Sequence, residues 1–199
     1  MPPMVDGAAE GIIRGMYRFR VAMPVADQQR KAHLFGSGAI MTEVLRAQTL
    51  LETLGVSADV WSVTSYNELC REGLRVEREN HLAPGTTPSR PYIVELLAAE
   101  KGVFVAASDY MKSLPLSIAS WVPGPYVVLG TDGYGLSESR AELRNWFEVS
   151  AEYIAWAALA ALFDAGAVSA AELGAAAGTL GIDRHKPDPA SAGPATMRS

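Results

Sequence analysis

Four short runs of apolar residues predict strands that are buried within a sheet. Each run is rich in valine, alanine or aromatic residues and shows little alternation of polar and apolar positions, as in strands covered on both faces. The runs are Ala32–Phe35, Val60–Thr64, Val103–Ser108 and Tyr126–Gly130. The earlier segment Met16–Val21 does alternate, which predicts a half-exposed strand at an edge of the sheet.

Helical patterns fill the segments between and after these strands. A serine stands three residues before a glutamate at three expected helix starts, the spacing of a capping box: Ser65/Glu68, Ser139/Glu142 and Ser169/Glu172. Ser150 begins the longest apolar helix, which ends at Gly166. Helical connections between strands are typical of right-handed crossovers. The pattern therefore predicts an α/β fold: a three-layer α/β/α sandwich with a mostly parallel five-stranded sheet and one antiparallel edge strand.

The length suits one compact domain. A chain of 199 residues can bury a sizeable core without disulfides or metals. We expect a linker over residues 1–14, the domain over residues 15–182 and a flexible tail over residues 183–199, which is rich in proline.

Composition and charge exclude several classes of protein. The net charge of −5 argues against nucleic acid as a partner, because phosphate binding needs a clustered positive field. The longest apolar stretch, Ala155–Phe163, falls short of the ~20 residues of a membrane span. The amino terminus lacks the pattern of a secretory signal, and the single cysteine excludes an internal disulfide. We therefore expect a cytoplasmic protein that binds neither nucleic acid nor membrane.

Two glycine-rich turns follow predicted strands. Residues 36–38 read Gly-Ser-Gly at the place where dinucleotide folds hold a phosphate. The third glycine of that motif is replaced by Met41, which favours a plain tight turn. The second turn, residues 130–135, lacks the Gly-Lys-Ser/Thr ending of a nucleotide-triphosphate loop, so a structural or interface loop is favoured over a ligand loop.

The histidines offer no recognisable chemistry. His33 lies within a predicted strand, His81 in a predicted proline-rich loop (His81–Pro91) and His185 in the tail, and no pair has the spacing of metal ligands. The chain also lacks a G-x-S-x-G nucleophile elbow. The residues by themselves thus indicate a fold but no reaction.

Several segments, in order, resemble a known family. The chain is similar to the last domain of pyruvate dehydrogenase, the acetyl-transferring thiamine-diphosphate enzyme of the homodimeric bacterial type, within the wider class of transketolase C-terminal domains. The matching segments are EGIIRGMY (10–17), LFGSGAI (34–40), SADVWSVTSYNELCREG (57–73), RPYIVELL (90–97), ASDYMKSLP (107–115) and LGTDGYGLSESRAELRNWFEVSAEYIAWAAL (129–159).

The resemblance implies a partial enzyme. In that family, thiamine diphosphate and Mg²⁺ are held by an N-terminal and a middle domain, both absent from this sequence. No catalytic, cofactor-binding or metal-binding residue of the family maps onto this chain, so the chain alone is expected to bind no cofactor and to be inactive. The implied partners are those two thiamine-binding domains, a second copy in a homodimer, and the lipoyl acetyltransferase core of the complex.

The resemblance also suggests which residues meet the missing domains. The expected contact elements are Ser108–Leu114 and Gly130–Arg140, with candidate interface residues Tyr110, Lys112, Asp132, Gly133, Tyr134, Gly135 and Arg140. Two alternatives stay open: a stand-alone, non-catalytic interaction or regulatory module with this fold, and a small-ligand binder that uses the loops after the strands.

Overall fold

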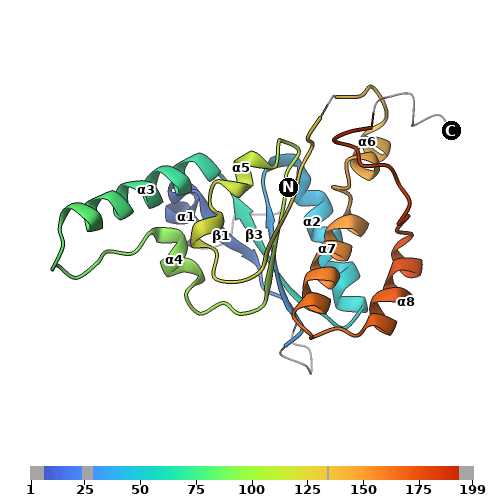
Figure 1. The fold of residues 1–199 in the computed structure, drawn as a ribbon, viewed down its shortest axis with the longest axis horizontal. Helices are drawn as coiled ribbons and strands as arrows, with labels where there is room; N and C mark the ends of the chain where they lie inside the picture. The colour runs from blue at the N-terminus through green and yellow to red at the C-terminus, as the bar shows by residue number, and fades with distance from the viewer. Residues whose placement is uncertain (1–6, 24–28, 134, 193–199) are drawn as a thin grey trace.

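A five-stranded sheet forms the centre of the domain. In the computed structural model, which describes residues 7–23, 29–133 and 135–192, the strand order is β1-β3-β2-β4-β5. Strands β3, β2, β4 and β5 are parallel, and β1 pairs with β3 in the antiparallel sense at one edge (Figure 1). The strands are β1 (Met16–Arg20), β2 (Lys31–Gly36), β3 (Ser57–Val63), β4 (Val103–Ala107) and β5 (Tyr126–Leu129). The predicted sheet, including its antiparallel edge strand, is confirmed.

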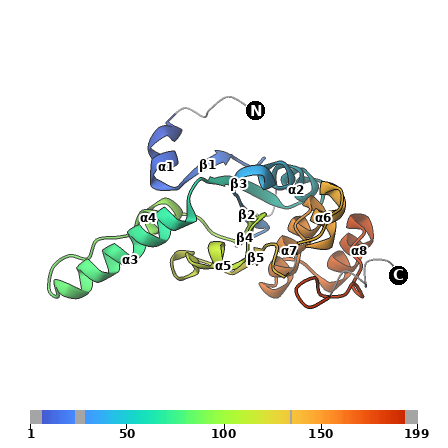
Figure 2. The ribbon, with the colours of Figure 1, turned by 90° about the horizontal axis from the view of Figure 1, so that it is seen from above.

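Helices cover both faces of the sheet, which accounts for the near-continuous apolar runs in the strands. One face packs on α2 (Met41–Thr53), α6 (Arg140–Trp146), α7 (Ala151–Asp164) and α8 (Ala170–Leu180). The other packs on α3 (Tyr66–Leu82), α4 (Tyr92–Leu97) and α5 (Ser113–Leu116), and α1 (Ala8–Arg14) lies beside β1 (Figure 2). Short 3-10 turns, η1 (Gly38–Ile40) and η2 (Ala119–Trp121), complete the elements.

Alternate side chains of each central strand enter opposite cores. In β2, Leu34 belongs to the core under α2 and α7, whereas Phe35 belongs to the core with Trp61 and Phe104. This alternation follows from the period of two along a strand. Burying both sets removes the polar positions that would otherwise mark an exposed face.

Three serines cap helices, but a reciprocal capping box forms at one of the predicted places. Ser169 and Glu172 exchange both hydrogen bonds. At Ser65 and Ser139 the hydroxyl accepts from the backbone N–H of the predicted glutamate, and the glutamate does not reach back. The carboxylate of Glu68 is bound instead by Arg71, one turn later on the exposed face of α3. That competition accounts for the missing half of the box at Ser65.

One run meets the length and composition of a membrane span. It comprises Arg140–Asp164, and 72% of its most apolar 18-residue stretch is buried inside the domain. The run contains two helices, α6 and α7, and α7 supplies much of the core against α2 and the sheet. We therefore interpret it as a core helix, which is apolar on all sides because protein surrounds it.

Candidate functional site at the carboxyl edge of the sheet

The two predicted contact segments lie side by side where β4 and β5 end. The backbone N–H of Thr131 donates to the carbonyl oxygen of Tyr110 (2.9 Å), and the Thr131 hydroxyl donates to the carbonyl oxygen of Asp109 (2.7 Å). The carboxylate of Asp132 accepts from the backbone N–H of Lys112 (3.0 Å). Residues that are about twenty positions apart in the sequence thus form one continuous surface.

Gly130 permits this close approach of the two segments. A Cβ at this position would lie 2.7 Å from the carbonyl oxygen of Tyr110 and 2.9 Å from the backbone nitrogen of Lys112. Gly133 has φ +95°, a backbone conformation that other residues rarely adopt. The glycines at these two positions are therefore required by geometry.

The candidate interface residues take different places on this surface. Tyr110 is exposed, as are its neighbours Met111 and Leu116. Asp132 is occupied by its bond to the backbone, so its role in the structure is to hold the two segments together. Gly135 and Arg140 are exposed and line a hollow in this surface, and Tyr134 lies outside the described residues.

The hollow lies beside the ends of β2, β4 and β5 and has a volume of about 410 Å³. Its polar wall contains Asp109, Thr131, Arg140 and Arg144. Its apolar wall is built by the following side chains: Ala39, Leu136, Leu143, Phe147 and Val149. The site therefore combines charged and apolar chemistry in one concave space.

A buried ion pair behind the hollow joins three helices. Arg144 of α6 donates to the carboxylate of Glu43 on α2 (2.9 Å), to the Ala39 carbonyl oxygen (3.1 Å) and to the Thr42 hydroxyl (3.3 Å). The second oxygen of Glu43 accepts from the backbone N–H of Ala151, the first residue of α7 (3.1 Å). Glu43 therefore holds α6 and α7 in place.

Two polar atoms near this ion pair have no hydrogen-bond partner in the part of the chain that the structure describes. They are Nε of Arg144 and the hydroxyl oxygen of Ser150, both buried. Ser150 precedes α7 but does not cap it by its side chain, and the carboxylate of Glu43 binds the first N–H of that helix instead. Sequence reasoning missed Glu43 and Arg144 altogether; the one available signal was a glutamate among the apolar positions of a helix.

A second cluster of ionisable side chains surrounds His33 of β2 and comprises His33, Asp59 of β3 and Glu100. The Nδ1 atom of His33 accepts from the indole N–H of Trp61 (3.2 Å), which leaves the proton on Nε2 to donate to the Lys101 carbonyl oxygen (3.1 Å). The carboxylates of Asp59 and Glu100 lie close enough to His33 to suggest a metal site. Both ring nitrogens are already used, Asp59 is bound by Lys31 (2.7 Å), and Glu100 is bound by Arg18. We interpret the group as a structural charge cluster.

Burial and charge shift the titration of this cluster. Burial lowers the pKa of His33 below its ordinary value, although the Lys101 hydrogen bond and nearby carboxylates oppose the shift. The pKa of Asp59 is also lowered: burial would raise it, but the bonds from Lys31 and from the Ala22 N–H outweigh burial. His33 is therefore neutral and Asp59 ionised in the folded protein near neutral pH.

This cluster predicts that acid destabilises the fold. Below about pH 6.5 the unfolded chain binds a proton at His33 that the folded chain does not, so stability falls as the pH falls. Asp59 adds a further loss below about pH 4, where the unfolded carboxyl binds a proton first. Urea unfolding between about pH 5 and pH 7.5 should show the His33 step. The variant His33→Gln should flatten this slope, whereas the exposed His81→Gln should keep it; equal slopes in all three proteins would contradict the assignment.

Known proteins identify the family of this chain. Residues 15–150 match the family model of the transketolase-like TK C-terminal domain. The pyruvate dehydrogenase E1 component of Pseudomonas aeruginosa is 46% identical over 193 residues, which cover 94% of this chain and 21% of that protein. The Escherichia coli K12 protein of the same name is 40% identical over 191 residues, which cover 95% of this chain and again 21% of that protein.

The chain thus spans about a fifth of the length of these relatives. A solved transketolase from Pichia stipitis shares the fold with a TM-score of 0.56, at 19% identity over 84% of this chain and 22% of its own. The resemblance expected from the sequence is confirmed by both the relatives and the fold. The chain belongs to the family of transketolase-like C-terminal domains, and its curated relatives are pyruvate dehydrogenase E1 components.

Proposed function

We propose that this chain is the C-terminal domain, or a separately encoded subunit, of a thiamine-diphosphate-dependent pyruvate dehydrogenase. It supports the domain assembly and dimer that decarboxylate pyruvate oxidatively to acetyl groups. The observation that carries the proposal is the 46% identity to a pyruvate dehydrogenase E1 component of which the chain makes up 21%. In this proposal residues 15–182 are the folding unit, with residues 1–14 as linker and residues 183–199 as tail.

The cofactors belong to the assembled enzyme in this proposal. Thiamine diphosphate supplies an electron sink for decarboxylation, and Mg²⁺ anchors its diphosphate. The cluster of His33, Asp59 and Glu100 does not fit the metal. Mg²⁺ prefers oxygen ligands and free carboxylates, whereas these three side chains are already bound to neighbouring side chains and backbone. The chain's own contribution is therefore binding and positioning of other domains.

The carboxyl-edge surface suits that role. Tyr110, Met111 and Leu116 expose apolar area beside the Gly130–Arg140 segment, and exposed apolar patches commonly mark contact sites. The proposed partners are the N-terminal and middle thiamine-binding domains, a second copy of the enzyme, and the lipoyl acetyltransferase core. We place this assembly in the cytoplasm.

Co-expression with the missing domains tests the proposal. The N-terminal and middle domains of the Pseudomonas aeruginosa relative should co-purify with this chain, and the mixture should reduce an artificial electron acceptor when given pyruvate. Arg140→Ala should weaken the association by about tenfold, because a guanidinium at an interface commonly carries binding energy. Arg78→Ala, on α3, is the matched control. Recovery of the chain alone, as a stable monomer with no effect on activity, would favour the stand-alone module.

A further inference from the structure

The hollow lies at the point in the fold where open α/β sheets bind ligands. The chain runs from β2 to β3 on one side of β2 and then crosses to β4 on the other side. The crevice outside the carboxyl ends of β2 and β4 is therefore the switch point of this sheet. Ala39, soon after β2, and Asp109, soon after β4, both line the hollow. Its volume of about 410 Å³ lies within the range of small-molecule sites.

The charges of the hollow favour an anion. The guanidinium of Arg144 is paired with the carboxylate of Glu43 (2.9 Å) and lies 3.9 Å from that of Asp109, so Arg140 supplies the positive charge that the described residues leave unpaired in the hollow. Arg144 is fixed by Glu43, and its side chain is 10% exposed. Arg140 is exposed and forms no ion pair with any residue that the structure describes, so its charge remains available to a ligand.

A neighbouring hollow, which Arg140 also lines, lacks an apolar wall. It is lined by three glutamates, Glu43, Glu142 and Glu152, against the three arginines Arg46, Arg140 and Arg144. Glu43 and Glu152 both pair with Arg46, at 2.9 and 3.2 Å. Apart from Ala141 its lining is charged or polar, so it offers no surface for hydrocarbon, and the first hollow is the candidate site.

The hollow also carries apolar area. Leu136, Leu143, Phe147 and Val149 supply a wall that can pack on hydrocarbon. The guanidinium of Arg140 lines the same hollow, so one ligand can meet a positive charge and an apolar surface together.

We propose that this hollow binds a small organic acid, with its carboxylate paired to Arg140 and its hydrocarbon part packed on Leu136, Leu143 and Phe147. The guanidinium of Arg144 stays paired with Glu43 and forms part of the wall beside the bound molecule. The site shares Arg140 with the proposed domain contact, but its binding can be measured on the chain alone.

Nuclear magnetic resonance of the chain alone, with three probes, tests the site. Benzoate carries both a carboxylate and an apolar ring, acetate carries the charge alone, and benzyl alcohol carries the ring alone. Benzoate should cause saturable shifts of the amides of Thr131, Leu136, Leu143 and Phe147, with a dissociation constant of about a millimolar. Acetate and benzyl alcohol should bind at least about tenfold more weakly, since each lacks one half of the recognition.

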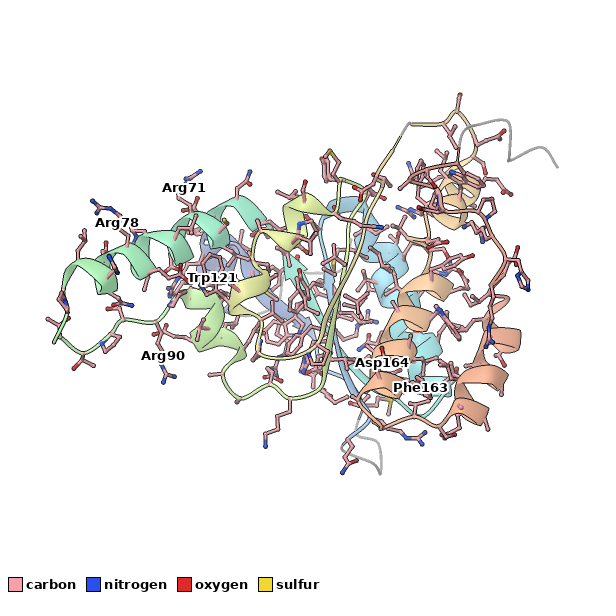
Figure 3. The ribbon with its side chains drawn as sticks, in the orientation of Figure 1. Arg71, Arg78, Arg90, Trp121, Phe163 and Asp164 are labelled. Atoms are coloured by element: carbon pink, nitrogen blue, oxygen red, sulfur yellow. The ribbon has the colours of Figure 1, made fainter. Side chains whose placement is uncertain are left out.

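Variants separate charge recognition from adventitious binding. Arg140→Ala should weaken the binding of benzoate by about tenfold and leave the binding of benzyl alcohol unchanged. Arg140→Lys should recover part of the lost affinity because it restores the charge. Arg78→Ala, whose side chain projects from α3 at the far end of the molecule, should change nothing (Figure 3). Shifts that are absent up to about 20 mM, that lie elsewhere, or that ignore Arg140→Ala would overturn the proposal.

This result is independent of the assembly experiment. Benzoate binding by a chain that fails to join the missing domains would leave the site standing and overturn the proposed function alone. Assembly with the missing domains, in the absence of any benzoate shift, would support the proposed function and overturn the ligand site.

Discussion

Replacing Glu43 by alanine should lower the free energy of unfolding by about 3–5 kcal/mol, because it leaves the buried guanidinium of Arg144 without its carboxylate. The side chains of Glu43 and Arg144 are 9% and 10% exposed, so water cannot readily take over the lost hydrogen bonds. The change also removes the acceptor of the Ala151 N–H at the start of α7. Urea unfolding followed by circular dichroism measures the loss.

Two further variants isolate the buried pair in this experiment. Glu152→Ala removes a more exposed carboxylate that pairs with Arg46, and it should cost less than about 1 kcal/mol. The double variant Glu43→Met/Arg144→Met removes both charges and should be more stable than Glu43→Ala, since no unpaired charge remains buried. If Glu43→Ala cost no more than Glu152→Ala, the pair would not be holding α6 and α7 to α2.

The sheet could be predicted because its strands are buried on both faces. Runs such as Val103–Ser108 contain little polar alternation, and at this short length, between turn residues, that pattern is typical of strands in a parallel sheet. The prediction placed the start of β3 at Val60, but the strand begins at Ser57. The difference arises at Asp59, which looks like a loop residue in the sequence but is buried as the partner of Lys31.

The candidate site could be predicted in part. Adjacent parallel strands end at the same edge of a sheet, so the meeting of the segments after β4 and β5 follows from topology. The ion pair of Glu43 with Arg144 could not be foreseen, because its partners are 101 residues apart. A single sequence does not distinguish a buried arginine in α6 from an exposed one such as Arg140, one turn earlier.

Close packing requires glycine at position 73, although no sequence pattern reveals this requirement. Gly73→Ala should lower the free energy of unfolding by about 2 kcal/mol. A Cβ at this position on α3 would lie 2.5 to 2.7 Å from three ring atoms of Trp121. The ring cannot easily move, because its indole N–H donates to the carboxylate of Glu77 (2.7 Å). This overpacking exceeds the gain of up to about 1 kcal/mol that alanine brings to a helix interior. Thermal and urea unfolding would measure the net effect.

The matched control is the same substitution where there is room for it. Gly174 lies inside α8, and a Cβ there would meet no described atom within 4 Å. Gly174→Ala should therefore raise the free energy of unfolding by about 0.5–1 kcal/mol, through helix propensity alone. In the background of Trp121→Phe, which removes the ring atoms that Cβ would strike, the cost of Gly73→Ala should shrink. Stabilisation by both alanines, or an unchanged cost beside Phe, would show that Trp121 does not set the requirement for glycine at position 73.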